Sequence, residues 1–157
     1  MSERNVVQRV FDDFGRLVDA EKKSGSWYLR GPEVTAVLNL QKSQYGPQYY
    51  FNLGLWFPAL DGERYPKPEK SHVVLRLNDA LPQWDRRIDA LLDLDRELGE
   101  AERRAELRSL FENELRPLLA RAATVAGVRE LVAEGPLAHA GIRAPAQMLL
   151  FGRVASQ

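Results

Sequence analysis

Residues 34–57 read VTAVLNLQKSQYGPQYYFNLGLWF, and this stretch decides the fold of the chain. On both sides of its central SQYGPQ, large apolar residues alternate with polar or smaller ones. Successive side chains of a β-strand point to opposite faces of a sheet, so this alternation is typical of strands with one apolar face. The stretch therefore predicts two strands joined as a hairpin, with the turn near residues 44–47.

The register of the hairpin follows from its two unlike faces. Pairing Leu38 with Leu53 puts the apolar side chains of both strands on one face and pairs Asn39 with Asn52 on the other. A slip of one residue would mix the two faces, so the pattern specifies this register. The expected pairs are Ala36–Leu55, Leu38–Leu53 and Leu40–Phe51 on the apolar face, and Asn39–Asn52 and Gln41–Tyr50 on the polar face.

Two more strands are predicted outside the hairpin. Residues 27–30 form a short strand before the turn at Gly31-Pro32, and residues 72–77 alternate again. In this last strand, Val73, Leu75 and Leu77 are expected to face the core, and His72, Val74 and Arg76 to face away. Residues 58–70 carry three prolines and six charged residues, which predicts a mobile loop.

Helices account for both ends of the chain. Apolar residues at three- and four-residue steps predict a first helix that Ser2 caps and that ends near Ala20. The same spacing recurs from Leu81 onward, where Pro117 must kink a long helix or start a new one. Pro145 fits the first turn of a last short helix.

The predicted fold is a single α+β domain over residues 1–157, a four-stranded antiparallel sheet with helices packed on one face. Its core is expected to be apolar side chains from both layers. The sheet is expected to supply Trp27, Leu38, Leu40, Phe51, Leu53, Leu55, Val73 and Leu75, and the helices Val10, Phe14, Leu91, Phe111, Leu115 and Leu118.

Composition argues against several classes of function. The chain has 22 basic and 22 acidic residues, and zero net charge makes duplex DNA an unlikely partner. It has no cysteine, which removes thiol catalysis, disulfides and thiolate metal ligands. No apolar run approaches the about 20 residues that cross a bilayer, and the charged N-terminal residues do not resemble a signal peptide. We therefore expect a cytoplasmic protein that makes no contact with a membrane.

The polar face of the hairpin is the candidate binding surface. Bulk stability does not require amides and aromatics at these positions, and such side chains bind a peptide, a base or a sugar through hydrogen bonds and stacking. The candidate binding residues are Asn39, Gln41, Lys42, Tyr50, Asn52, Trp56, His72 and Arg76. Two structural interpretations stay open beside this one: the solvated face of an antiparallel sheet, and an amide ladder that clips the loops.

No catalytic or metal-binding motif stands out. The only histidines, His72 and His139, are 67 residues apart, and a zinc site would need carboxylates to complete it. As a general base, His72 would need a nearby acid or nucleophile that the sequence does not place. Residues 42–46 lack the glycine pattern of a phosphate-binding loop and are expected to form the hairpin turn. We assign no catalytic residue, no metal and no cofactor.

Residues 22–57 also carry a resemblance to a known family. The motifs are Asn39-Leu40-Gln41-Lys42-Ser43, then Tyr45-Gly46, then Asn52-Leu53-Gly54. With SGSWYLR before them, they resemble domain-of-unknown-function family 4304, a family of small bacterial proteins. That family has no established activity, so the resemblance assigns no catalytic role. By analogy with small bacterial immunity and antitoxin proteins, it favours a role as the partner of another protein.

Two classes of function therefore remain open. The first is a non-catalytic binding module for a protein partner, and we favour it because arginine, tyrosine and tryptophan are the residues that anchor interfaces. The second is a small enzyme or a nucleotide- or RNA-binding protein that uses His72, Arg76, Lys42 and Tyr50 around a pocket. A local excess of three positive charges over residues 22–52 keeps single-stranded RNA open as a ligand, beside a small molecule.

Overall fold

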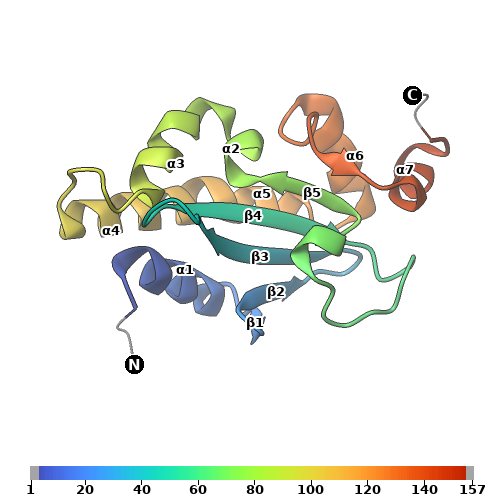
Figure 1. Cartoon of the computed structure of the whole chain (residues 1–157). Coiled ribbons are helices and arrows are strands. Elements are labelled where there is room, and N and C mark those ends of the chain that lie inside the picture. The colour runs from blue at the N-terminus through green and yellow to red at the C-terminus, as the bar shows by residue number, and fades with distance from the viewer. Residues whose placement is uncertain (1–3, 155–157) are drawn as a thin grey trace.

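A sheet of six antiparallel strands forms the centre of the structure, a computed structural model that describes residues 4–154 (Figure 1). The strands lie side by side in their order along the chain. They are β1 (Glu21–Lys23), β2 (Ser26–Arg30), β3 (Thr35–Lys42), β4 (Tyr49–Trp56), β5 (Val73–Arg76) and β6 (Gly141–Ile142). The α+β class and the antiparallel sheet are as predicted.

The predicted strand count of four is wrong, because a short strand lies at each edge of the sheet. β1 pairs with β2 through a two-residue turn, in which Ser24 and Gly25 both have positive φ, at 51° and 85°. Such a turn matches the twist of a hairpin, so the residues between the first helix and the strand predicted at 27–30 form one more strand. β6 has only two residues and pairs with β5 from far along the chain, so no local pattern indicates it.

The predicted register of the central hairpin is confirmed at every pair. β3 and β4 place Leu38 opposite Leu53 and Asn39 opposite Asn52, with the other three predicted pairs in step. The sheet consequently has an apolar face and a second face that carries the amides. The strand predicted at residues 72–77 is β5, and it is shorter than predicted, because it ends at Arg76 and the next residue, Leu77, begins a helix.

α1 (Val6–Leu17) is the first helix, and its start is fixed by a reciprocal cap. The Asn5 side chain accepts the Gln8 backbone N–H at 3.0 Å, and the Gln8 side chain accepts the Asn5 backbone N–H at 3.0 Å. This capping box satisfies donors that the first turn leaves free. Ser2, the predicted cap, lies outside the described residues, and the helix ends before the predicted Ala20.

Apart from two three-residue 3₁₀-helices, Pro68–Lys70 and Pro82–Trp84, the remaining helices all come after β5 in the chain. They are α2 (Leu77–Ala80), α3 (Asp85–Leu92), α4 (Glu100–Leu110), a π-helical segment (Phe111–Leu115), α5 (Arg116–Arg121), α6 (Val125–Glu134) and α7 (Ala144–Phe151). Pro117, which was predicted to kink a long helix or start a new one, lies in the first turn of α5, and α5 continues directly from the π-helical segment. α6 and α7 lie together beyond β5, at one end of the molecule (Figure 1). Among residues 4–154, no helix combines the length and the apolar content that a membrane span requires.

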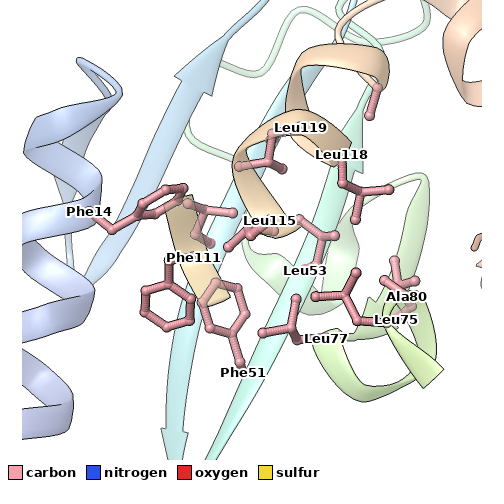
Figure 2. Close-up of a cluster of buried hydrophobic side chains, with 14 of the residues drawn as sticks. Phe14, Phe51, Leu53, Leu75, Leu77, Ala80, Phe111, Leu115, Leu118 and Leu119 are labelled. Carbon is pink, nitrogen blue, oxygen red and sulfur yellow. The ribbon is translucent and has the colours of Figure 1, made fainter. Parts of the chain in front are cut away.

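The apolar face of the sheet packs against the helices, with three phenylalanines from different elements at the centre. The Phe111 ring lies 5.5 Å from the Phe51 ring of β4 and 5.5 Å from the Phe14 ring of α1, between centroids. Figure 2 shows this group beside the leucines of the π-helical segment and α5, which lie over Leu53 and Leu75 of the sheet. Every predicted core residue is buried except Leu40, which is half-buried and still contacts the core.

The segment expected to be a mobile loop is held against the opposite face of the sheet. We call residues 58–70 the strap. The Tyr28 hydroxyl donates to the Pro66 carbonyl at 2.9 Å, and the Trp56 indole N–H donates to the Asp61 carbonyl at 2.9 Å. A glycine at position 54 allows this approach, because a Cβ there would lie 3.3 Å from the Pro68 carbonyl oxygen and 2.4 Å from the hydroxyl oxygen of Ser71, the residue after the strap. The strap therefore covers one end of the face that carries the amides and leaves the other end open.

Candidate functional site

A groove of about 690 Å³ opens on the uncovered part of the polar face. Its floor comes from β3, β4 and β5, the strap forms one wall, and α2 closes one end. It is lined by Asn39, Gln41, Asn52, Leu53, Pro68, Glu69, Val74, Leu75, Arg76 and Asp79. Four of the eight predicted binding residues, Asn39, Gln41, Asn52 and Arg76, line this groove.

The three amides on the groove floor form a ladder across two strands. Asn52 Nδ2 donates to Gln41 Oε1 at 3.0 Å and to Asn39 Oδ1 at 3.4 Å. Asn39 Nδ2 in turn donates to the Ser26 hydroxyl oxygen of β2 at 3.2 Å. Within residues 4–154, no contact occupies the Gln41 Nε2 donor or the Asn52 Oδ1 acceptor. The ladder thus holds the amides in place and still leaves a donor and an acceptor for a ligand.

Arg76 and Tyr50 form a stacked pair beside the ladder. The Arg76 guanidinium carbon lies 4.1 Å from the centroid of the Tyr50 ring. Arg76 is exposed and makes no ion pair with any described carboxylate. A guanidinium held by its face keeps the N–H donors at its edge free, and these match a carboxylate or phosphate in a two-pronged contact. The pair therefore presents a fixed positive charge to the groove.

Two carboxylates supply the opposite charge. Glu69 stands on the strap and Asp79 on α2, both are exposed, and both line the groove. Among the described residues, neither side chain is engaged in a salt bridge. Lys42 is exposed at the end of β3 and is not one of the lining residues. The groove consequently offers one positive and two negative charges to whatever enters it.

Trp56 and His72 lie outside the groove, under the strap. Their rings stack at 4.1 Å between centroids, and each residue is only 6% exposed. His72 Nδ1 accepts the backbone N–H of Phe57 at 2.9 Å. Both side chains lie on the polar side of the sheet, as their strand positions predict, but the covered end of the face uses them for packing. Their predicted binding role therefore has no open surface here.

The buried His72 makes stability depend on pH. Burial lowers the pKa of the imidazole below its ordinary 6.5, the charge of Arg143 lowers it further, and Asp61 acts in the opposite direction. The unfolded chain therefore takes up this proton at a higher pH than the folded chain. The free energy of unfolding should be largest above about pH 7 and should fall as the pH drops below about 6.5.

Urea denaturation at several pH values between 5.5 and 7.5 measures this dependence. The matched control is His72→Asn, because the asparagine side-chain oxygen can accept the Phe57 N–H and does not titrate in this range. The wild type should lose more stability than this variant between pH 7.5 and 5.5. Equal losses in the two proteins would show that His72 does not titrate differently on unfolding.

Neither a metal-binding cluster nor the second histidine adds to the groove among residues 4–154. Within residues 4–154, no three or more histidine, cysteine, aspartate or glutamate side chains are arranged to hold a metal ion. His139 is exposed in the segment between α6 and β6, where it lines a separate depression. The hydrogen-bonding amides and the stacked arginine are therefore the chemistry on which a function of the groove must rest.

Sequence reasoning missed the two carboxylates and the strap wall. Glu69 lies in the segment expected to be a mobile loop. Asp79 lies in the four-residue helix α2, and no helix was predicted between the strand that was expected to end at Leu77 and the helical spacing from Leu81. Contacts of the strap with distant residues, among them Tyr28, Trp56 and Arg143, bring Glu69 beside the amides. No feature of the local sequence indicates those contacts.

Comparison with known proteins extends the match to most of the chain. The family model described as Domain of unknown function (DUF4304) matches residues 21–121, which run from β1 to the end of α5. No curated protein and no solved structure matches the chain. The matched region is about two thirds of the 157 residues and contains every residue that lines the groove. The chain therefore belongs to the DUF4304 family.

Proposed function

We propose that this protein is a non-catalytic binding module that recognises a protein partner through the groove. The observation that carries the proposal is the exposed Arg76, stacked on Tyr50 and without a carboxylate partner among the described residues. A free guanidinium at a fixed position beside a row of amides is an arrangement for hydrogen bonding to another molecule. Arginine and tyrosine are also the residue types that contribute most at interfaces.

The fixed geometry of the side chains supports recognition with little loss of entropy. The ladder from Ser26 to Gln41 restrains the amides before a ligand arrives, and the Tyr50 ring restrains Arg76. A binding surface that is already ordered loses less conformational freedom on association. The groove volume of about 690 Å³ also lies in the range of sites that bind a small ligand or a short peptide segment.

The position of His72 favours binding over catalysis. The enzyme alternative needs this histidine as an acid or base near Arg76 and Tyr50. Instead, His72 lies under the strap, and its Nδ1 accepts a backbone N–H. The groove itself holds the guanidinium, the amides and two carboxylates that lie on different elements. This arrangement suits recognition better than proton transfer.

The two carboxylates favour a protein partner over RNA. Glu69 and Asp79 would repel the phosphates of a strand that lay in the groove, and electrostatic attraction to phosphates is the main source of affinity for nucleic acids. A protein surface carries charges of both signs and can pair with the arginine and with the carboxylates. A bacterial, cytoplasmic protein that covers and inhibits another protein, as an immunity or antitoxin protein does, is the form of this function that we propose.

Affinity purification from the producing cells tests the proposal. Tagged wild type, Arg76→Ala and Arg86→Ala would be compared by quantitative mass spectrometry. Arg86 is a matched control, because it is an exposed arginine on α3 and does not line the groove. A partner should be recovered in near-equimolar amount with wild type and with Arg86→Ala, and its recovery should fall about tenfold with Arg76→Ala, as expected for an interface anchor.

Two results would contradict the proposed function. One is equal recovery of the partner with Arg76→Ala and with wild type, when circular dichroism shows both to be folded. The other is the recovery of RNA or a small molecule with wild type and of no protein in comparable amount. The second result would favour the alternative that the groove binds a nucleotide or RNA.

A further inference from the structure

We infer that the groove binds an extended peptide segment that carries one acidic and one basic side chain, the acidic group on Arg76 and the basic group near Glu69 and Asp79. This inference rests on the proposed function and specifies the chemistry of the partner. It comes from the distribution of unpaired charges and unoccupied hydrogen-bonding groups along the groove.

The acidic group is required by Arg76. Its guanidinium carbon lies 4.1 Å from the centroid of the Tyr50 ring, and its N–H groups make no ion pair with a described carboxylate. A planar carboxylate satisfies two of these donors at once. No described carboxylate does so within this chain, although both Glu69 and Asp79 line the same groove. We therefore expect the partner to supply the acceptor.

The basic group is required by the two carboxylates. Glu69 on the strap and Asp79 on α2 are both exposed and both line the groove, and neither is in a salt bridge among the described residues. A ligand with acidic groups alone would meet Arg76 favourably and be repelled by both carboxylates. A ligand with basic groups alone would leave Arg76 opposed by a like charge. Charge complementarity thus selects a segment that bears both signs.

The amide ladder is expected to bind the main chain of the peptide, between its two charged side chains. Gln41 Nε2 is an unoccupied donor and Asn52 Oδ1 an unoccupied acceptor, and a hydrogen bond from Asn52 Nδ2 to Gln41 joins their side chains. An extended peptide presents carbonyl and N–H groups in alternation along its edge, and it can satisfy one donor and one acceptor that lie close together. A nucleic-acid backbone offers repeated acceptors with a negative charge, which the carboxylates disfavour.

A random heptapeptide library displayed on phage tests this specificity on the full chain. The immobilised baits would be wild type, Arg76→Ala, and the double variant Glu69→Gln with Asp79→Asn, at about 150 mM salt so that distant charges are screened. Peptides selected by wild type should be enriched in sequences with both an acidic and a basic residue. Arg76→Ala should lose the preference for the acidic residue and keep the basic one, and the double variant should do the reverse.

Binding of a selected peptide is then measured directly. Its affinity should fall about tenfold for Arg76→Ala and for the double variant, and it should be unchanged for Arg86→Ala. In ¹⁵N spectra of the wild type, the side-chain NH₂ signals of Gln41 and Asn52 should shift on titration with the peptide, because these groups are proposed to touch its main chain.

The outcomes separate this inference from the proposed function. Selected peptides that shift the Gln41 and Asn52 signals without a charge preference would overturn the inference and leave the groove as a peptide-binding site. Failure to enrich any peptide, or shifts confined to residues outside the groove, would overturn both. Binding of a fluorescent oligouridine that competes with the peptide and weakens steeply with salt would also overturn both, in favour of RNA.

Discussion

Replacement of Phe111 by alanine is expected to lower the free energy of unfolding by about 3–5 kcal/mol, as large-to-small changes of buried aromatics do. Phe111 is 1% exposed and lies between Phe14 and Phe51, at 5.5 Å from each ring (Figure 2). Its removal therefore leaves a cavity between α1, the sheet and the π-helical segment, and it also breaks both ring contacts. Urea denaturation followed by circular dichroism measures the loss.

Glu112→Ala is the matched control for this variant. Glu112 is the next residue of the same π-helical segment and is exposed. Its replacement should change stability by no more than about 0.5 kcal/mol, as is usual for surface positions. If Phe111→Ala lost less than about 1 kcal/mol, the π-helical segment would not place that ring in the core. Leu115, Leu118 and Leu119, which follow in the same helix, would then not face the core either.

Replacement of Leu53 by alanine is expected to cost about 2–5 kcal/mol. Leu53 is 2% exposed, pairs with Leu38 across the hairpin, and packs under the leucines of α5 (Figure 2). The neighbouring Asn52 points to the groove, so Asn52→Ala should cost less than about 1.5 kcal/mol, the scale of a single hydrogen bond. Thermal or urea unfolding of the two variants thus compares how much stability each face of β4 contributes.

The reverse order of these two costs would mean that the faces of β4 are exchanged. That result would contradict the register of the hairpin and, with it, the position of the groove. Similar costs for both variants would show that the face with the amides is packed as tightly as the core, which the open groove does not permit.

The sequence alone predicted the central hairpin because its two faces differ in chemistry along its whole length. A register error would have put Leu38 and Leu53 in water and Asn39 and Asn52 in the core, so only one pairing is favourable. The same contrast picked out the three amides Asn39, Gln41 and Asn52, which are among the residues that line the groove. Most of the predicted core followed from the same alternation and from helical spacing.

The edge strands and the strap were not predicted, because distant contacts determine them. β6 has two residues and exists only because β5 offers it an unpaired edge. The strap looks like a mobile loop in sequence, with its prolines and charges, and contacts with distant residues hold it, including hydrogen bonds from Tyr28, Trp56 and Arg143 and the close approach at Gly54. A local pattern contains none of this information.

Two of the candidate binding residues lie away from the groove for the same reason. Alternation correctly put Trp56 and His72 on the polar side of the sheet, but the strap covers that end and makes them part of a second packed layer. The strap and α2 also bring Glu69 and Asp79 to the groove. The sequence could therefore predict the floor of the site, and only the three-dimensional structure shows its walls and its charges.

The most direct test of the central claim, that the groove is the surface that meets a partner, is photo-crosslinking in the producing cells. A benzophenone amino acid would replace Gln41 on the groove floor or, as a control, Arg86 on the exposed side of α3. We expect a protein crosslink from position 41 and none from position 86. A crosslink to the same protein from position 86, with none from position 41, would contradict the claim.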